Sequence, residues 1–271
     1  MYKYGYSELK LPIYYIDSFT EKVFQGNPAA VVLVKENLDV KTMQSIAFEN
    51  NLSETAFVNI ALSPYLIRWF TPTVEVDLCG HATLASARIL FDEYLPGDCS
   101  QIIFDSKKRG TLTAFKKGDL IYLNFPVDQP EEVEQNNIII EGLGEKPIKT
   151  YKGKDDYLAV FDDEEIIQTM APDFKKLSKL DSRGLIITAP GEGVDFVSRF
   201  FSPQSGVDED PVTGSAYTLM IPYWYGKLGK RKFTARQLSF RSGHVECELI
   251  EDRVLIGGKT ARYLEGKILI Q

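Results

Sequence analysis

The chain has 271 residues, enough for one large domain or two domains of about 130 residues each. Its net charge of −7 disfavours binding to a nucleic-acid backbone, and no apolar run approaches the ~20 residues that span a bilayer. Three scattered cysteines and a start without the apolar core of a signal peptide favour a cytoplasmic protein. With only two histidines, we expect no metal site.

The first half of the chain alternates short strand-like and helical segments. Residues 13–19 and 29–34 are predicted strands. A helix capped by Asp39 and ending near Asn50 follows, and a polar loop then leads into a strand at 55–58. The apolar face of that helix should hold Val40, Met43, Ile46 and Ala47.

An internal repeat comes next along the chain. The sequence RWFTP at 68–72 recurs as RFFSP at 199–203, 131 residues later, and each copy is followed by an acidic loop, a glycine turn and an apolar run. Upstream of the second copy, Asp173 can cap a helix through Leu180 before a strand at 185–188. The same order of elements therefore occurs twice.

The repeat predicts two similar, pseudo-symmetric domains over residues 1–127 and 128–271. They join in a proline- and acid-rich stretch at 126–132, and the last strand, 267–271, is a candidate to cross back to the first domain. The runs that follow the two glycine turns are apolar on nearly every side, so each should be a buried helix. The other predicted strands are 102–104, 112–115, 120–125, 238–241, 245–249 and 253–256.

The two glycine turns are the first candidates for a binding site. Gly80 and Gly214 each stand at a predicted helix start, where free N–H groups and a partial positive charge suit a small carboxylate. Two such turns related by pseudo-symmetry should face one cleft. The competing interpretation is that glycine merely permits a tight turn and close helix packing.

Three side chains near these turns can take part in proton transfer. Glu54 lies in the loop that corresponds to Arg183 in the second half, and a carboxylate there suits acid–base work. His81 follows Gly80, and a helix start should favour its neutral form. Asp210 precedes the second turn and can orient His81 or bind a substrate. Each also has a structural interpretation as a surface or packed residue.

Cys79 is the one cysteine at a glycine turn. Racemisation by paired thiols needs two thiols on opposite sides of one carbon, and the second half offers none at the corresponding position. A lone nucleophile or a buried small apolar residue are the interpretations left open for Cys79.

Taken together, the motifs resemble the phenazine-biosynthesis PhzF-like family of isomerases, which is related in fold to diaminopimelate epimerase and proline racemase. The resemblance covers nearly the whole chain. It rests on four segments in the family's order: 17–31, which contains DSFT and GNPAAV; 51–57, NLSETAF; 68–83, which contains RWFTP and EVDLCGHAT; and 208–216, DEDPVTGSA.

This resemblance implies an α/β (α+β) fold of two domains, each a barrel-like sheet around a central helix, with the active site in the cleft between them. It implies that Glu54 is the acid–base residue, and that His81, Asp210 and Ser215 complete the site. The chain departs from the family pattern at 241–243, RSG in place of RGG, and at Tyr217, where many members carry histidine.

The chemistry implied by the resemblance uses no cofactor. Glu54 removes a proton from one carbon of a small carboxylate-bearing metabolite and returns it at another, and the protein is expected to be a homodimer. GxGxxG and P-loop patterns are absent from the sequence, in agreement. Two alternatives remain: a catalytically silent ligand-binding protein, and an epimerase or racemase that does not use two thiols.

Overall fold

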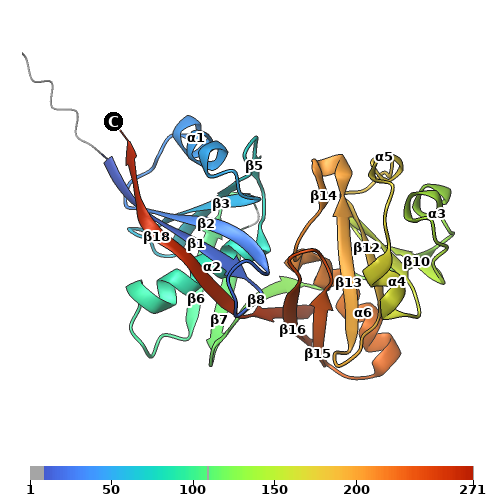
Figure 1. Cartoon of the computed structure of the whole chain (residues 1–271). Coiled ribbons are helices and arrows are strands. Elements are labelled where there is room, and N and C mark those ends of the chain that lie inside the picture. Colours follow the sequence, from blue (N-terminus) through green and yellow to red (C-terminus); the bar gives the residue numbers. More distant parts are fainter. Residues whose placement is uncertain (1–8, 109, 271) are drawn as a thin grey trace, which may run out of the picture.

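The computed structural model describes residues 9–108 and 110–270 as two lobes side by side (Figure 1). Residues 1–8 of the expected first domain and residue 271 of the expected last strand lie outside the described residues. The first lobe's elements, in chain order, are β1 (Leu9–Ser18), β2 (Asn27–Val34), α1 (Val40–Asn50), β3 (Glu54–Asn59), β4 (Tyr65–Phe70), β5 (Glu75–Val76), α2 (Gly80–Ile89), the π-helical turn η1 (Leu90–Tyr94), β6 (Gln101–Ser106), β7 (Gly110–Lys117) and β8 (Leu120–Pro126).

The second part of the chain repeats much of this order. Its elements are β9 (Glu131–Val133), α3 (Asn137–Leu143), β10 (Lys149–Lys152), β11 (Asp156–Val160), α4 (Glu164–Thr169), α5 (Phe174–Leu177), β12 (Gly184–Pro190), β13 (Phe196–Ser202), the 3-10 turns η2 (Pro203–Ser205) and η3 (Gly214–Ala216), with β14 (Val207–Glu209) between them, then α6 (Tyr217–Leu228), β15 (Lys232–Gln237), β16 (Gly243–Ile250), β17 (Arg253–Gly258) and β18 (Thr260–Ile270).

Strand pairing follows one scheme in both halves. β2 and β3 are parallel, as are β11 and β12, and β4 runs parallel to β6 as β13 does to β15. The antiparallel pairs β3–β4 and β12–β13 also correspond, as do the meanders β6–β7–β8 and β15–β16–β17. The predicted α/β fold of two similar halves is confirmed.

The two halves exchange strands at their junction. β8 pairs antiparallel with β17, which joins the halves through equivalent strands. β9 then pairs with β10 of the second half, whereas β18 returns to pair with β1 along most of its length. Each half is therefore completed by a strand that follows the other half's meander, and the returning segment begins at residue 260 rather than 267 (Figure 1).

Helices α2 and α6 are the buried helices of the two halves. Every residue of α2 from His81 to Ala87 is buried, as are six of the twelve residues of α6. Pro222 lies inside α6, yet the helix continues to Leu228. A proline cannot donate to the carbonyl four residues back, and that carbonyl, Thr218 O, instead accepts the backbone N–H of Asp128 at 3.1 Å. The linker between the halves thus supplies the hydrogen-bond donor that Pro222 lacks. Within the described ranges, no helix is both long and apolar enough to span a bilayer.

The recurring motif occupies equivalent places in the two halves. Arg68 on β4 makes a two-pronged ion pair with Glu75, with both N···O distances 2.7 Å. Arg199 on β13 pairs in the same way with Glu209 at 2.7 and 3.0 Å. The two motifs therefore match in sequence and also in the ion pair that the arginine of each motif makes with a glutamate.

Three sequence predictions need correction. The helix capped by Asp173 ends at Leu177 instead of Leu180, because the following residues continue only as turns. Val40, expected on the apolar face of α1, is exposed because it is the first residue of the helix and its side chain faces solvent.

Residues 238–241, expected to be a strand, form a loop between β15 and β16. Phe240 at the tip of this loop is fully exposed, so this apolar residue does not belong to the core. The loop's function is visible in Arg241, whose guanidinium donates to Asp17 at 2.7 Å and to the Gly26 carbonyl at 2.8 Å. These contacts tie the second half to the first.

Candidate active site

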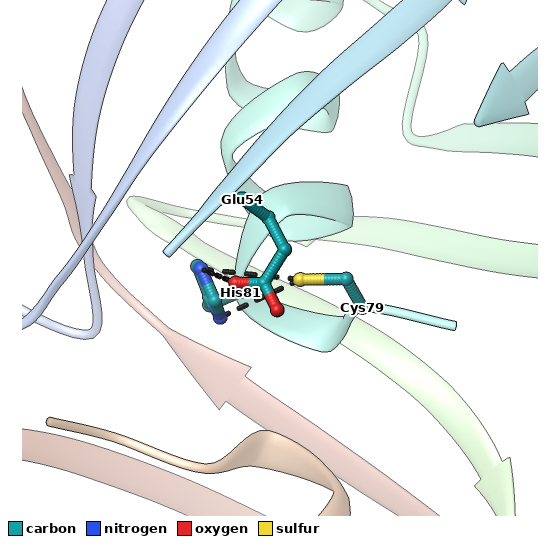
Figure 2. A group of neighbouring side chains, drawn as sticks. All are labelled: Glu54, Cys79 and His81. Carbon is teal, nitrogen blue, oxygen red and sulfur yellow. Dashed lines mark hydrogen bonds and ion pairs between the residues drawn. The ribbon is translucent and has the colours of Figure 1, made fainter. Parts of the chain in front are cut away.

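The site forms where β3 and α2 begin. Glu54 is the first residue of β3, directly after the polar loop that leaves α1. Cys79 is the N-cap of α2 in an extended conformation, and His81 is the second residue of the helix. β3 also contacts the buried helix α2, and the three side chains point toward one another (Figure 2).

The distances within this group are short. Glu54 Oε2 lies 3.2 Å from His81 Nε2, and Cys79 Sγ lies 3.6 Å from His81 Nδ1 and 3.9 Å from Nε2. Cys79 and His81 are buried, whereas Glu54 is half-buried. Among the described residues, Glu54 Oε2 finds no well-aligned hydrogen-bond donor, so the 3.2 Å contact is an ion-pair contact. A lone pair of this carboxylate therefore remains available.

The pKa of His81 runs against the sequence prediction of a neutral ring. Burial lowers the pKa of His81, but interactions with Cys79 and Glu54 raise it by more, and the pKa lies well above the ordinary value. Burial also raises the pKa of Cys79 to about 11, so the thiol is protonated at neutral pH. With the thiol protonated, the charge attraction that favours an imidazolium at neutral pH comes from the Glu54 carboxylate, whose Oε2 lies 3.2 Å from Nε2.

The two glycine turns lie against each other at the junction of the halves. A Cβ added to Gly80 would stand 3.8 Å from Gly214 Cα. Their N-cap residues are Cys79 and Thr213, and neither side chain makes a capping hydrogen bond to its helix in the described structure. The two helix starts thus lie next to each other, the second opening with the 3-10 turn η3, and the cleft expected between them stays a prediction.

Asp210 is held rigidly beside this junction. Its Oδ1 accepts from Asn27 Nδ2 at 2.8 Å, and its Oδ2 accepts a short hydrogen bond from the Thr213 hydroxyl. Burial raises the pKa of Asp210, the charge of His81 lowers it, and the charge of Glu54 raises it. These effects place Asp210 within electrostatic reach of both residues, so the structure brings the predicted acid–base residues together.

Ser215 stands at the edge of the group. Its Oγ accepts from Arg183 at 2.9 Å, and no described hydrogen bond or ion pair joins it to Glu54 or His81. Arg183 also forms a two-pronged ion pair with the buried Asp156. Arg183 is therefore fixed in place at the rim.

The expected correspondence between Glu54 and Arg183 is shifted by one residue. Thr55 pairs with Phe70, and Leu185 pairs with the equivalent Phe201. The strand register therefore makes Gly184 the counterpart of Glu54. The sequence offered no fixed reference point for this alignment, because the preceding loops differ in length.

Sequence reasoning missed a set of supporting amides. Asn27, fully buried, donates to both Asp210 and the Val212 carbonyl, and its own Oδ1 has no hydrogen-bond partner in the described structure. Gln237 accepts from the Thr213 N–H at 2.9 Å and donates to the Asp210 carbonyl at 2.8 Å. Asn27 was visible as part of the GNPAAV segment, whereas nothing near Gln237 marked it in the sequence.

The unusual serine in RSG also has a structural explanation. Ser242 adopts φ = 53°, in the left-handed region that favours glycine. Its hydroxyl donates to the Gln237 carbonyl at 3.0 Å, and its carbonyl accepts from the Gly26 N–H at 2.7 Å. Serine thus tolerates the conformation while bracing the loop beside the site.

Two surface cavities lie elsewhere. One of about 110 Å³ is lined by Met43 and Arg68 among others, and one of about 210 Å³ by Leu143 and Met170 among others. Neither includes a residue of the Glu54 group. The chemistry of the side chains, rather than the volume of a cavity, therefore identifies the candidate site.

The fold and the site define the class of protein. Two pseudo-equivalent halves, each with a buried helix that starts at a shared junction, form an epimerase-like α/β fold. A solved structure described as a probable proline racemase from Agrobacterium radiobacter K84 has this fold, with a TM-score of 0.65 over 96% of this chain and 93% of that one, at 9% identity.

The family follows from closer matches. Residues 16–266 match the model of the phenazine biosynthesis-like (PhzC/PhzF) proteins. An uncharacterized isomerase of Pseudomonas aeruginosa is 45% identical, over 96% of this chain and 99% of that protein. A crystal structure of a PhzF-family phenazine biosynthesis protein from Enterococcus faecalis has a TM-score of 0.92 at 44% identity, covering 96% of this chain and 99% of that one. The chain belongs to the PhzF family of isomerases.

Proposed function

We propose that the protein is an isomerase that moves a proton between two carbons of a small carboxylate-bearing metabolite, with Glu54 as general base and then general acid. One observation carries this proposal. The Glu54 carboxylate has an oxygen that makes no aligned hydrogen bond among the described residues and lies in ion-pair contact, at 3.2 Å, with the His81 imidazole at the junction of the two halves. A base must keep such a lone pair free to accept a proton.

The proton transfer has two steps in this scheme. Glu54 takes a proton from a carbon that lies next to a conjugated system, and the electron pair left on that carbon delocalises over the system. The same carboxyl group then delivers the proton to another carbon of the substrate. Because base and acid are one residue, no cofactor enters the scheme, and the electrons stay within the substrate.

The negative charge that develops on the substrate needs stabilisation. The imidazolium of His81, with its raised pKa, supplies a positive charge and an N–H donor. The uncapped start of α2 adds free N–H groups and a partial positive charge. Both are fixed before the substrate arrives, so they need little reorganisation during the reaction.

The substrate carboxylate is assigned to the two glycine turns. Gly80 and Gly214 have no side chain to block an approach to the backbone, and Ser215 offers a hydroxyl beside them. Asp210, held by Asn27 and Thr213, orients the substrate rather than transferring its proton. We assign this chemistry to a cytoplasmic homodimer, on the composition and the family resemblance.

The test is deuterium exchange into small carboxylates with an acidic C–H bond, incubated with the protein in heavy water. Glu54→Gln keeps the size of the side chain and removes the exchangeable proton, so exchange should fall by about 100-fold or more. Asp210→Asn should cost less, because it alters orientation only. Glu49→Gln, at an exposed position on α1, is the matched control and should exchange like the wild type.

Substrate binding should survive in Glu54→Gln, which calorimetry can check. Exchange by Glu54→Gln at the wild-type rate would refute Glu54 as the base. Binding without exchange in the wild type would favour the silent ligand-binding alternative.

A further inference from the structure

Glu54, Cys79 and His81 also form a set of metal ligands. Their carboxylate oxygen, sulfur and ring nitrogen all lie within 4.8 Å of one another. The sequence did not predict this set, because Glu54 is separated from the other two by a complete strand pair and only the fold joins them. The three donor types are those found at zinc sites with an open fourth position.

The spacing of the donors matches a tetrahedral site. Bonds of about 2.3 Å to sulfur and about 2.1 Å to nitrogen or oxygen place sulfur and nitrogen about 3.6 Å apart, and nitrogen and oxygen about 3.4 Å apart. With Nε2 as the nitrogen ligand, the structure has 3.9 Å for sulfur to nitrogen and 3.2 Å for nitrogen to Glu54 Oε2. Metal binding would therefore draw Cys79 Sγ closer to His81 and move Glu54 Oε2 slightly away from it.

Two further observations favour a cation at this position. Glu54 Oε2 is shielded from solvent and makes no aligned hydrogen bond among the described residues, so coordination would replace only its ion-pair contact with His81. Asp210 adds a second carboxylate within electrostatic reach, which offsets the positive end of α2. Thiolate and imidazole ligands select zinc over magnesium or calcium.

We propose that Glu54, Cys79 and His81 form a binding site for Zn²⁺ that switches the enzyme off. The metal binds the thiolate, the neutral imidazole and the carboxylate, and the protons of the thiol and the imidazolium pass to solvent. The fourth position stays open to water or a substrate oxygen. The inhibitory part rests on the proposed function, because coordination would occupy the Glu54 oxygen that takes the proton.

Binding is tested with Co²⁺ as a spectroscopic substitute for zinc on the metal-stripped full chain. The wild type should show a thiolate-to-cobalt charge-transfer band in the near ultraviolet and intense tetrahedral bands in the visible, both abolished by equimolar Zn²⁺. Cys79→Ser should lose the charge-transfer band and bind Zn²⁺ about 100-fold or more weakly, beyond the 10–100-fold typical of outer-shell partners. Cys99→Ser, outside the group, is the control and should retain the band.

A second variant makes the assignment independent of the cysteine. Glu54→Gln should keep the charge-transfer band at saturating Co²⁺ but bind Zn²⁺ more weakly, because a carboxamide is a poor ligand. Circular dichroism and thermal unfolding confirm that each variant is folded. Absence of the band in the wild type, or its survival in folded Cys79→Ser, would overturn the site.

Inhibition is measured separately, in the deuterium-exchange assay. Zn²⁺ should suppress exchange by the wild type, and a chelator should restore it. If the metal-stripped protein is instead inactive and Zn²⁺ restores activity, the inhibitory part of the proposal is wrong and Glu54 does not act as a free base. Cobalt binding without any exchange activity would support the metal site while counting against the proposed function.

Discussion

The two halves share a frame but carry different chemistry. Arg68–Glu75 and Arg199–Glu209 are ion pairs of nearly the same geometry at equivalent strand positions. Each arginine also lies over an aromatic ring of its own strand, 5.2 and 5.0 Å from the centroid. In both halves these contacts lie in the segment just before the glycine turn.

At the turns themselves the halves differ. Cys79 and His81 of the first half correspond to Thr213 and Ser215 of the second, because the two turns align at their glycines. The counterpart of Glu54 is Gly184, where an added Cβ would come within 2.2 Å of the Phe200 ring. The second half therefore has no room for a carboxylate at this position, and the comparison teaches that a duplicated frame can carry different side chains at equivalent positions.

The largest expected effect comes from making the two turns alike. His81→Ser places the second half's residue in the first half and removes the imidazolium, so turnover in the exchange assay should fall by about 100-fold or more. Ser215→Ala, the change at the equivalent position, should cost about 10-fold or less, because a neutral hydroxyl contributes less than a charged donor. Equal losses for the two variants would show that the halves share the chemistry after all.

A smaller effect is expected from the paired arginines. Arg68→Met leaves Glu75 unpaired and should lower the free energy of unfolding by about 2 kcal/mol, between the values for surface and buried pairs. Arg199→Met should cost about 1–3 kcal/mol more, because Arg199 also donates to the carbonyls of Ile167 and Met170 at 3.1 and 2.7 Å. Urea denaturation measures both. A larger loss of unfolding free energy for Arg68→Met would contradict the expectation that Arg199 stabilises its half more than Arg68 does.

For each pH unit, the smallest effect is a dependence of stability on pH. The pKa of His81 is raised by folding, so its contribution to stability is complete below about pH 6.5 and declines as the pH rises toward the folded value. The free energy of unfolding should therefore fall above pH 6.5, by at most about 1.4 kcal/mol per pH unit for one proton.

His81→Asn should remove this decline, whereas His244→Asn should preserve it, because His244 is exposed and lies outside the group. Denaturant unfolding at several pH values between about 6 and 9 provides the measurement. An unchanged decline in His81→Asn would assign the titration to another group.

Local sequence patterns determined much of the fold. The caps at Asp39 and Asp173, the repeated RxFxP segment and the glycine turns each act over a few residues, so they predicted element order and the two-fold repeat. The same locality explains the errors. Residues 238–241 are apolar enough for a strand, but the pairing of Arg241 with Asp17, more than two hundred positions away in the chain, makes them a loop.

The motifs also named Glu54, His81 and Asp210, because these residues lie in the segments that resemble the family. The sequence could not predict the protonation of these residues, because the raised pKa of His81 depends on how closely β3 brings Glu54 to α2. Asn27 and Gln237 were missed for the same reason: amides are common, and only the fold shows which ones reach a buried carboxylate. The sequence thus determined which chemical groups exist and in which local elements. The tertiary structure alone decided their distances, their protonation and their partners, because these depend on packing between segments far apart in the chain.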